Sequence, residues 1–202
     1  MGLLYGGLTA RRFRVVGDLP PEWREHFRDQ LTKHNFREPA NRAGKEEYEG
    51  WVRVQNMLDN DFDDPNLWLF NSFMLISLRV DKKVLPAKLL NATVDRKCRE
   101  WAAQAGVQRV PTAKKKEIKE ALETEWLERA LPRVQLTEVG WNTVEGWALV
   151  SSTSEKIVDR VRKRFARTFG LELVPWSPLD AIVDPAMMEN MLQSEPVHWS
   201  AP

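Results

Sequence analysis

The sequence has little of what marks several large classes of protein. Cysteine occurs once in 202 residues, at Cys98, which excludes an internal disulfide framework and a multi-cysteine zinc site. The most apolar stretch, Leu67 to Val80, is interrupted by polar and charged residues and falls short of the roughly 20 apolar residues of a membrane helix. The first residues lack the basic region and the cleavage site of a secretory signal. We therefore expect a cytoplasmic protein that does not bind a membrane.

The common catalytic and metal-binding motifs are also missing. The chain contains no GxxxxGK, GxGxxG or GxSxG segment, and its three histidines have no metal-ligand spacing. Alternating aspartates begin at Asp59 as in a calcium loop, but Asp64 and Phe70 stand where that loop needs glycine and glutamate. Cys98 lies on an apolar helical stripe, which is typical of a buried, inert thiol. We predict no enzymatic activity, no metal and no cofactor.

Charge is nearly balanced over the whole chain but not along it. The formal net charge is +1, which excludes a wholly basic or wholly acidic particle. Residues 82–133 hold 13 Lys and Arg against 7 Asp and Glu, a net of +6, and residues 155–167 hold 6 against 2, a net of +4. Residues 45–66 hold 2 against 7, and residues 171–202 hold none against 5, so each nets −5. The sequence therefore predicts basic helices and an acidic tail.

Hydrophobic periodicity predicts both strands and helices, without a regular βαβ alternation. Strands are expected near residues 12–15, 51–54, 134–141, 144–150 and 171–176, and residues 67–80 form one long strand or a hairpin bent near Asn71 and Ser72. Helices are expected at 23–31, 86–105, 113–130 and 185–193, with a third long helix ending at Gly170, while residues 35–50 read as a loop. This pattern favours an α+β fold with mostly antiparallel sheets flanked by helices and a long central helix pair.

The same pattern divides the chain into four segments. Residues 1–81 form an N-terminal strand and helix half, 82–131 the basic helix pair, 132–178 a hairpin, helix and strand half, and 179–202 an acidic tail. The short helix of the tail has too few apolar residues to be stable alone. We expect residues 177–202 to pack back across the body, partly covering the basic residues, or to reach a second subunit; a disordered tail is the alternative.

The basic helices are the positive functional signal. On the third long helix five cations share one face, opposite the apolar positions: Lys156, Arg160, Lys163, Arg164 and Arg167. Four lysines crowd the start of the preceding helix, where they oppose the helix dipole: Lys114, Lys115, Lys116 and Lys119. Arg12 and Arg14, on one face of the first strand, would extend the patch if they lie nearby. Phosphate binding explains such a patch; the alternative is a solvated face in which nearby glutamates neutralise the lysines.

Residues 78–178 also resemble one known family. The pieces that carry the resemblance are Leu85-Pro86 after a strand, KKKEIKEAL at Lys114 to Leu122, ALPR at Ala130 to Arg133, the hairpin with Gly146, SSTSEK at Ser151 to Lys156, and the closing LELVPWSP. In their order and spacing they resemble the RdgC family, the recombination-associated proteins of bacteria. The resemblance implies a cytoplasmic, nucleoid-associated protein that binds DNA with little sequence preference, forms a ring-shaped dimer and restrains the recombinase RecA.

The resemblance also implies where the DNA would bind. The basic lining of the family's ring corresponds in kind to the four lysines at 114–119 and the cations at 156–167. The sequence departs from the family at two points. Val134-Gln135 replaces an aromatic residue beyond the LPR motif, and an acidic tail stands where the family continues into a further C-terminal domain that helps close the ring. We therefore expect a more open arrangement than a closed ring.

Two functions of different classes follow. The first is sequence-tolerant binding to double-stranded DNA by a homodimer, in the service of recombination. The alternative is a non-enzymatic interaction or assembly protein that keeps the fold without binding DNA, which the acidic segments and the near-zero net charge favour.

Overall fold

The computed structural model describes residues 2–4, 6–38, 47–177, 180, 182 and 184–194. Its body is a seven-stranded sheet with the strand order β2-β4-β5-β6-β1-β7, and β3 pairs with β4 beside that path. Every pairing between the strands of this sheet is antiparallel. The strands are β1 (Arg11–Val16), β2 (Glu47–Arg53), β3 (Leu69–Phe70), β4 (Phe73–Lys82), β5 (Arg133–Asn142), β6 (Trp147–Val150) and β7 (Glu172–Pro175). The predicted α+β fold is confirmed.

The sheet joins strands that are far apart in the sequence. β1 lies between β6 and β7, so the first strand of the chain completes the sheet of the last ones. β4 and β5 form the long centre, with an unbroken register from Phe73 opposite Asn142 to Lys82 opposite Arg133. The segments 1–81 and 132–178 therefore share one layer and one core.

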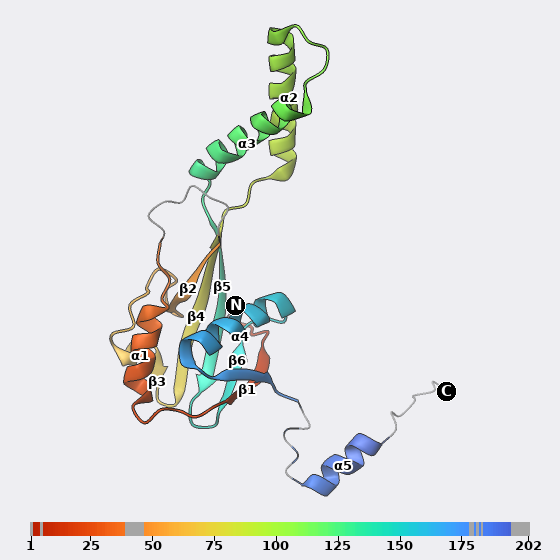
Figure 1. The fold of residues 1–202 in the computed structure, drawn as a ribbon. Coiled ribbons are helices and arrows are strands. Elements are labelled where there is room, and N and C mark those ends of the chain that lie inside the picture. Colours follow the sequence, from red (N-terminus) through yellow and green to blue (C-terminus); the bar gives the residue numbers. More distant parts are fainter. Residues whose placement is uncertain are drawn as a thin grey trace.

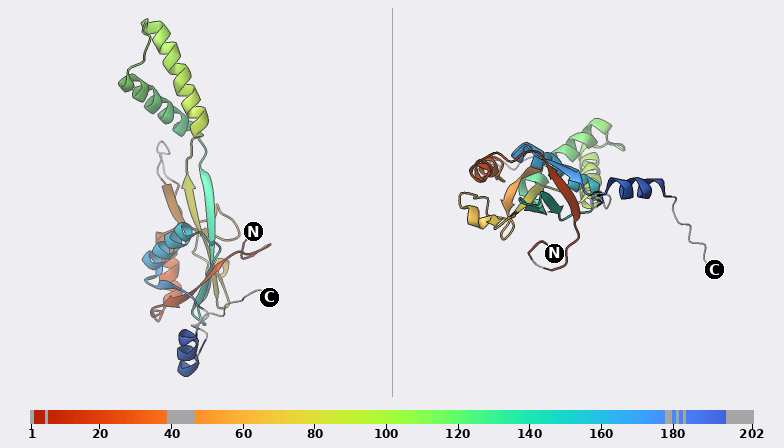
Figure 2. Two further views of the ribbon diagram at one scale, coloured as in Figure 1. Left: turned by 90° about the vertical axis from the view of Figure 1, so that its right-hand side faces the viewer. Right: turned by 90° about the horizontal axis from the view of Figure 1, so that it is seen from below.

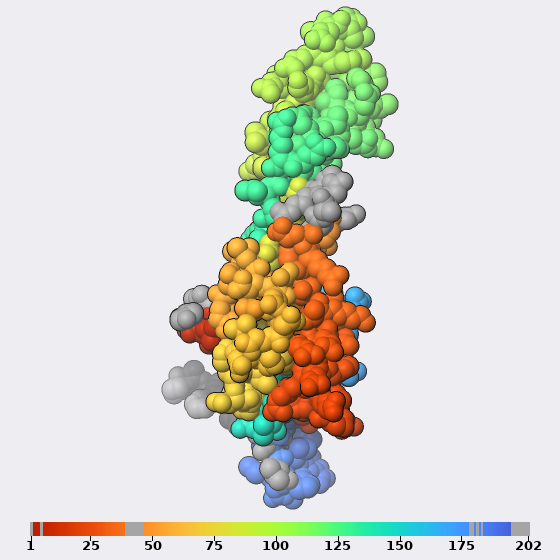
Figure 3. All heavy atoms as spheres, turned by 90° about the vertical axis from the view of Figure 1, so that its left-hand side faces the viewer, coloured from red at the N-terminus to blue at the C-terminus, as the bar shows by residue number. Residues whose placement is uncertain are grey.

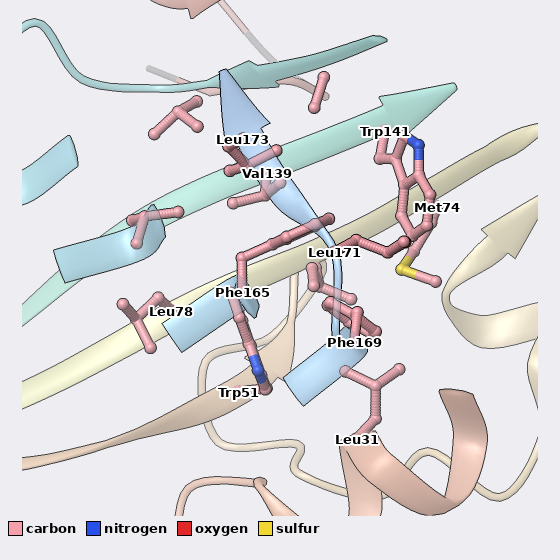
Figure 4. Packing of buried hydrophobic residues seen from close by; sticks show 14 of the residues in the cluster. Leu31, Trp51, Met74, Leu78, Val139, Trp141, Phe165, Phe169, Leu171 and Leu173 are labelled. Carbon is pink, nitrogen blue, oxygen red and sulfur yellow. The ribbon is translucent and has the colours of Figure 1, made fainter. Parts of the chain in front are cut away.

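Two helices cover one face of this sheet, α1 (Trp23–Lys33) and α4 (Glu155–Phe169) (Figures 1 and 2). α4 buries aromatic side chains against the strands, and the rings of Phe165 and Phe169 lie 4.7 Å apart (Figure 4). Phe169 also meets Phe27 of α1 at 4.9 Å. The indole of Trp51 on β2 donates to the Thr168 hydroxyl of α4 over 2.9 Å, so its polar atom is paired inside the core. These contacts fix α4 on the body.

The basic helix pair projects from one end of the sheet as an arm, residues 87–129 (Figures 1 and 3). It consists of α2 (Ala87–Ala105) and α3 (Thr112–Arg129), and β4 and β5 lead into and out of it. A separate small core of Leu90, Val94, Cys98 and Leu122 holds the two helices together. Cys98 is buried there, as predicted.

Two local predictions are settled by the chain path. The stretch 67–80 is a hairpin rather than a single strand, and Asn71 turns it with a φ of 56°. The prediction of a loop over residues 35–50 is wrong at its end, because β2 begins at Glu47 and not at Trp51. Residues 39–46 of that prediction lie outside the described residues. The side chains of Glu47 and Glu49 point to cations rather than to an apolar core, so these residues lack the apolar period of a strand.

The described part of the acidic tail contacts the body at Asp180, whose carboxylate lies 3.9 Å from Arg14 of β1, but the helix of the tail does not. Asp184 caps α5 (Pro185–Gln193) by accepting from the Ala186 amide, as predicted. α5 buries none of its side chains and stands away from the sheet (Figure 1). The expectation that the tail packs back over the basic residues is therefore wrong for α5. The remaining element is a short 3-10 helix, η1 (Pro65–Leu67), and no helix of the described residues is both long and apolar enough to span a membrane.

Candidate nucleic-acid interface

α4 is the most clearly two-sided helix of the body. Val158, Val161 and Phe165 are buried against the sheet at helical spacing, which leaves the opposite side to charged residues. The five predicted cations of α4 all lie on that side, with Glu49 of β2 and Asp159, around a hollow of about 380 Å³. The structure therefore brings together the α4 residues that the sequence analysis selected.

Two of these five cations are held by carboxylates of β2. Arg160 binds Glu47 with 2.6 Å between Nη2 and Oε2. Arg164 has a side chain only 12% exposed, lies 3.6 Å from Glu49, and donates to the backbone carbonyls of His34 and Glu49. Burial lowers the pKa of the Arg164 guanidinium, and the Glu49 carboxylate acts in the opposite direction. Arg160 and Arg164 thus join α4 to β2, and their charge is largely neutralised there.

The other three are free for a ligand. Lys156, Lys163 and Arg167 are exposed, and no described carboxylate forms an ion pair with them. At a rise of about 1.5 Å per residue they extend over roughly 16 Å of helix. We name these three residues the α4 basic row. A row of exposed cations along a rigid helix suits a linear polyanion better than a small molecule.

The lysines of the arm are already paired. Lys114 lies 2.7 Å from Glu117 and Lys115 lies 3.0 Å from Asp95 of α2, while Lys116 and Lys119 approach Glu120 and Glu123 one turn later. This is the arrangement of a solvated face in which glutamates neutralise lysines. Exposed ion pairs contribute little and are easily exchanged. The arm lysines therefore remain predicted DNA contacts, but their field is weaker than their number suggests.

Arg12 and Arg14 do not extend the α4 basic row. Side chains alternate along β1, and Phe13 is buried on the side that α4 covers. Arg12 and Arg14 therefore lie on the opposite face of the sheet. There the Arg12 guanidinium stacks between Trp147 and Trp176, at 4.9 and 4.7 Å from their ring centroids. The expectation that these two arginines join the patch is wrong in its geometry.

The carboxylates that organise this face were not predicted from the sequence. Glu47 accepts from Lys82 and from Arg160, and these hydrogen bonds lower the pKa of its carboxyl group. His34 lies beside the same face, and burial, Arg164, Lys33 and Arg167 lower the pKa of its imidazole. Glu47, Glu49 and Trp51 are alternate residues and share one face of β2. This spacing was the sequence pattern that could have predicted a strand whose inner face is charged at its start and apolar at its end.

Comparison with known proteins places the chain in a family. The sequence model of the family described as "Putative exonuclease, RdgC" matches residues 10–196. The chain belongs to the RdgC family. Among its curated relatives, the "Recombination-associated protein RdgC" of Paraburkholderia phymatum is 29% identical over 147 residues, 71% of this chain and 45% of the relative. The protein of the same name from Burkholderia cenocepacia is 27% identical over 174 residues, 82% of this chain and 54% of the relative.

These relatives are longer than the chain, which spans about half of their length. Their printed name associates them with recombination, whereas the description of the RdgC family model names an exonuclease. Among the described residues, no three His, Cys, Asp or Glu side chains are grouped so that they could hold a metal. The predicted lack of enzymatic activity stays a prediction.

Proposed function

We propose that this RdgC-family protein binds double-stranded DNA without sequence preference, through the α4 basic row. The observation that carries the proposal is the row itself: three exposed cations without a described carboxylate partner, on a helix fixed to the body core. Such residues contact phosphates, which every duplex presents alike. Among the described residues, none holds a side chain of the row in a fixed orientation that would select one kind of base. We therefore expect the protein to bind duplexes of different sequence with the same affinity.

The name of the relatives supports a role in recombination, and we include it in the proposal. The same proposal contains a homodimer, association with the nucleoid in the cytoplasm, and the recombinase RecA as the protein whose action is affected. The paired lysines of the arm supply a second, weaker contact to the duplex in this scheme.

The test uses fluorescence anisotropy with two duplexes of unrelated sequence. At low salt both are expected to bind with the same affinity, and between about 50 and about 200 mM salt that affinity falls steeply. A triple variant, Lys156→Ala, Lys163→Ala and Arg167→Ala, is expected to weaken both duplexes at least tenfold, or about 1.4 kcal/mol. No binding at low salt, or an affinity that does not change with salt, contradicts the proposal.

The matched control is the triple variant Lys114→Ala, Lys115→Ala and Lys116→Ala on the arm. It removes the same positive charge but from residues that already have carboxylate partners. We expect it to weaken binding by less than the α4 variant and equally for both duplexes. An arm variant that loses more affinity than the α4 variant would move the principal site to the arm.

The alternative function, an interaction protein without nucleic acid, is favoured by one feature. α5 exposes Met187, Met191 and Leu192, although a nine-residue helix is not stable on its own in water. Light scattering with and without duplex DNA separates the two functions. The alternative is supported if the protein binds no duplex but forms a defined oligomer without DNA. The α4 triple variant should then form the same oligomer.

A further inference from the structure

Among the strands that the structure describes, the first half of β5 has a neighbour on one side only. β4 pairs with β5 along its whole length, but β6 is short and pairs only with residues 139–142. Residues 133–137 thus form a free edge of the sheet beside the base of the arm. Free edges present backbone donors and acceptors to any extended chain.

The contacts of Glu138 show which backbone groups face outward. Its N–H donates to the Ser151 hydroxyl over 2.7 Å and its carbonyl accepts from the Ser151 amide over 2.9 Å, both on the β6 side. Backbone groups alternate between the two sides of an antiparallel strand, and the register with β4 is unbroken. The N–H and carbonyl groups of Leu136 and Val134 therefore point to the free side as well. No described residue binds them.

A groove runs between this edge and the start of α4. It has a volume of about 620 Å³ and borders both the β5 edge and apolar and hydroxyl side chains. Its charged lining residues are four cations and one carboxylate: Lys82, Arg133, Lys156, Arg160 and Glu47. Lys82 and Arg160 both bind Glu47, which leaves Arg133 and Lys156 without a described carboxylate partner. The groove therefore attracts negative charge.

The two faces of the edge differ in character. Arg133 is an even number of residues from Val139 and Trp141, so its side chain lies on the same face of the sheet as theirs. That face is covered by α4, and Arg133 therefore faces the basic groove. Val134 and Leu136 point to the other face, where Leu136 is 44% exposed. A strand added here would place alternate side chains against cations and against apolar groups.

We propose that the free edge of β5 binds an extended segment of a protein partner as an added strand, with acidic side chains alternating with apolar ones. Main-chain hydrogen bonds to Val134 and Leu136 hold the strand, and the groove selects its acidic residues. The outward carbonyls argue against a phosphate backbone, which has no donor for them. Pairing with β5 of a second copy would bring Arg133 and Lys156 of both copies together, and like charges oppose it.

The test needs no DNA, so its failure leaves the proposed duplex binding untouched. The probe is a fluorescent synthetic heptapeptide of alternating valine and glutamate, measured by anisotropy with the full chain. Two further peptides carry N-methyl groups on all valines or on all glutamates. In an added strand the backbone N–H groups of either the valines or the glutamates face β5, but not both. One methylated peptide is therefore expected to lose at least tenfold in affinity, and the other to lose little. Equal binding of all three peptides, or none, overturns the proposal.

Protein variants locate the site. Leu136→Pro removes an outward N–H without removing a bond to β4, and it is expected to weaken the peptide at least tenfold. Leu136→Val keeps that N–H and serves as the control, with far-UV circular dichroism to compare their folding. If the proline variant does not fold, amide exchange on the unaltered protein shows whether the peptide binds at this edge. Peptide is expected to protect the amides of residues 134 and 136 and to leave that of 135, which faces β4, unchanged.

Two outcomes of the exchange measurement would identify a different ligand for this edge. Protection of residues 134 and 136 by duplex DNA but not by the peptide would assign the edge to nucleic acid and overturn the proposal. Protection that grows with protein concentration in the absence of peptide would assign it to a second copy and overturn the proposal equally.

Discussion

α4 and the arm both carry clusters of lysine and arginine, but they are supported by different amounts of structure. α4 buries five residues, and four of them, including Val161 and Phe165, belong to the main hydrophobic core between the helices and the sheet. The arm rests on a small core of four buried residues. The charges differ as well, since the α4 basic row has no described carboxylate partner and the arm lysines pair with glutamate or aspartate. The number of cations in a segment is therefore a poor guide to its field.

The comparison predicts first that α4 and the body unfold together. Phe165→Ala removes a fully buried ring that contacts Trp141 and Phe169, and it is expected to lower the free energy of unfolding by about 3–5 kcal/mol. Urea unfolding followed by tryptophan fluorescence measures the loss. A change below about 1 kcal/mol would show that α4 is not part of the cooperative core.

The arm is expected to respond as a separate unit. Leu122→Ala opens its small core and is expected to cost about 2 kcal/mol, at the low end for a buried leucine because few neighbours surround it. Amide exchange should show lost protection in α2 and α3 and unchanged protection in the sheet. Equal loss of protection in β4 and β5 would contradict the division into body and arm.

Removing a carboxylate that pairs with an α4 cation should affect both stability and DNA affinity. Glu49→Gln removes the carboxylate that faces Arg164 and is expected to lower the free energy of unfolding by about 1 kcal/mol. The same change adds one uncompensated positive charge to the hollow beside Lys163, so duplex affinity at low salt is expected to rise severalfold. Asp95→Asn, which unpairs Lys115 on the arm, is the control and is expected to raise affinity less.

The smallest effect concerns pH. The pKa of His34 is lowered in the folded state by burial and by nearby cations, so the unfolded chain binds this proton more strongly. The free energy of unfolding therefore decreases as the pH falls below about 6.5. His34→Gln should remove part of that decrease. Urea unfolding at about pH 7.5 and pH 5.5 compares the variant with the unaltered protein; identical decreases in both would show that His34 does not contribute.

Most of the fold could be predicted from apolar spacing, because buried positions recur at 3.6 residues in α4 and the buried Phe13 alternates with exposed arginines in β1. The face that each strand turns to a helix could not, since alternation at Arg12 and Arg14 defines two faces without saying which one α4 covers. The neutralisation of Lys116 by Glu120 follows from helical spacing, but that of Lys115 by Asp95 depends on how α2 and α3 pack. The strand at Glu47 was missed because its inner side chains meet arginines instead of apolar residues.

The salt dependence of duplex binding is the most direct measure of whether the α4 basic row contacts DNA. The slope of the logarithm of the binding constant against that of the salt concentration reports how many phosphates the protein neutralises, at about 0.9 per contact. Removing Lys156, Lys163 and Arg167 together is expected to reduce the magnitude of that slope by up to about 2.7, and the arm triple variant to reduce it by less. A slope that stays unchanged in the α4 variant would show that the duplex does not contact this row.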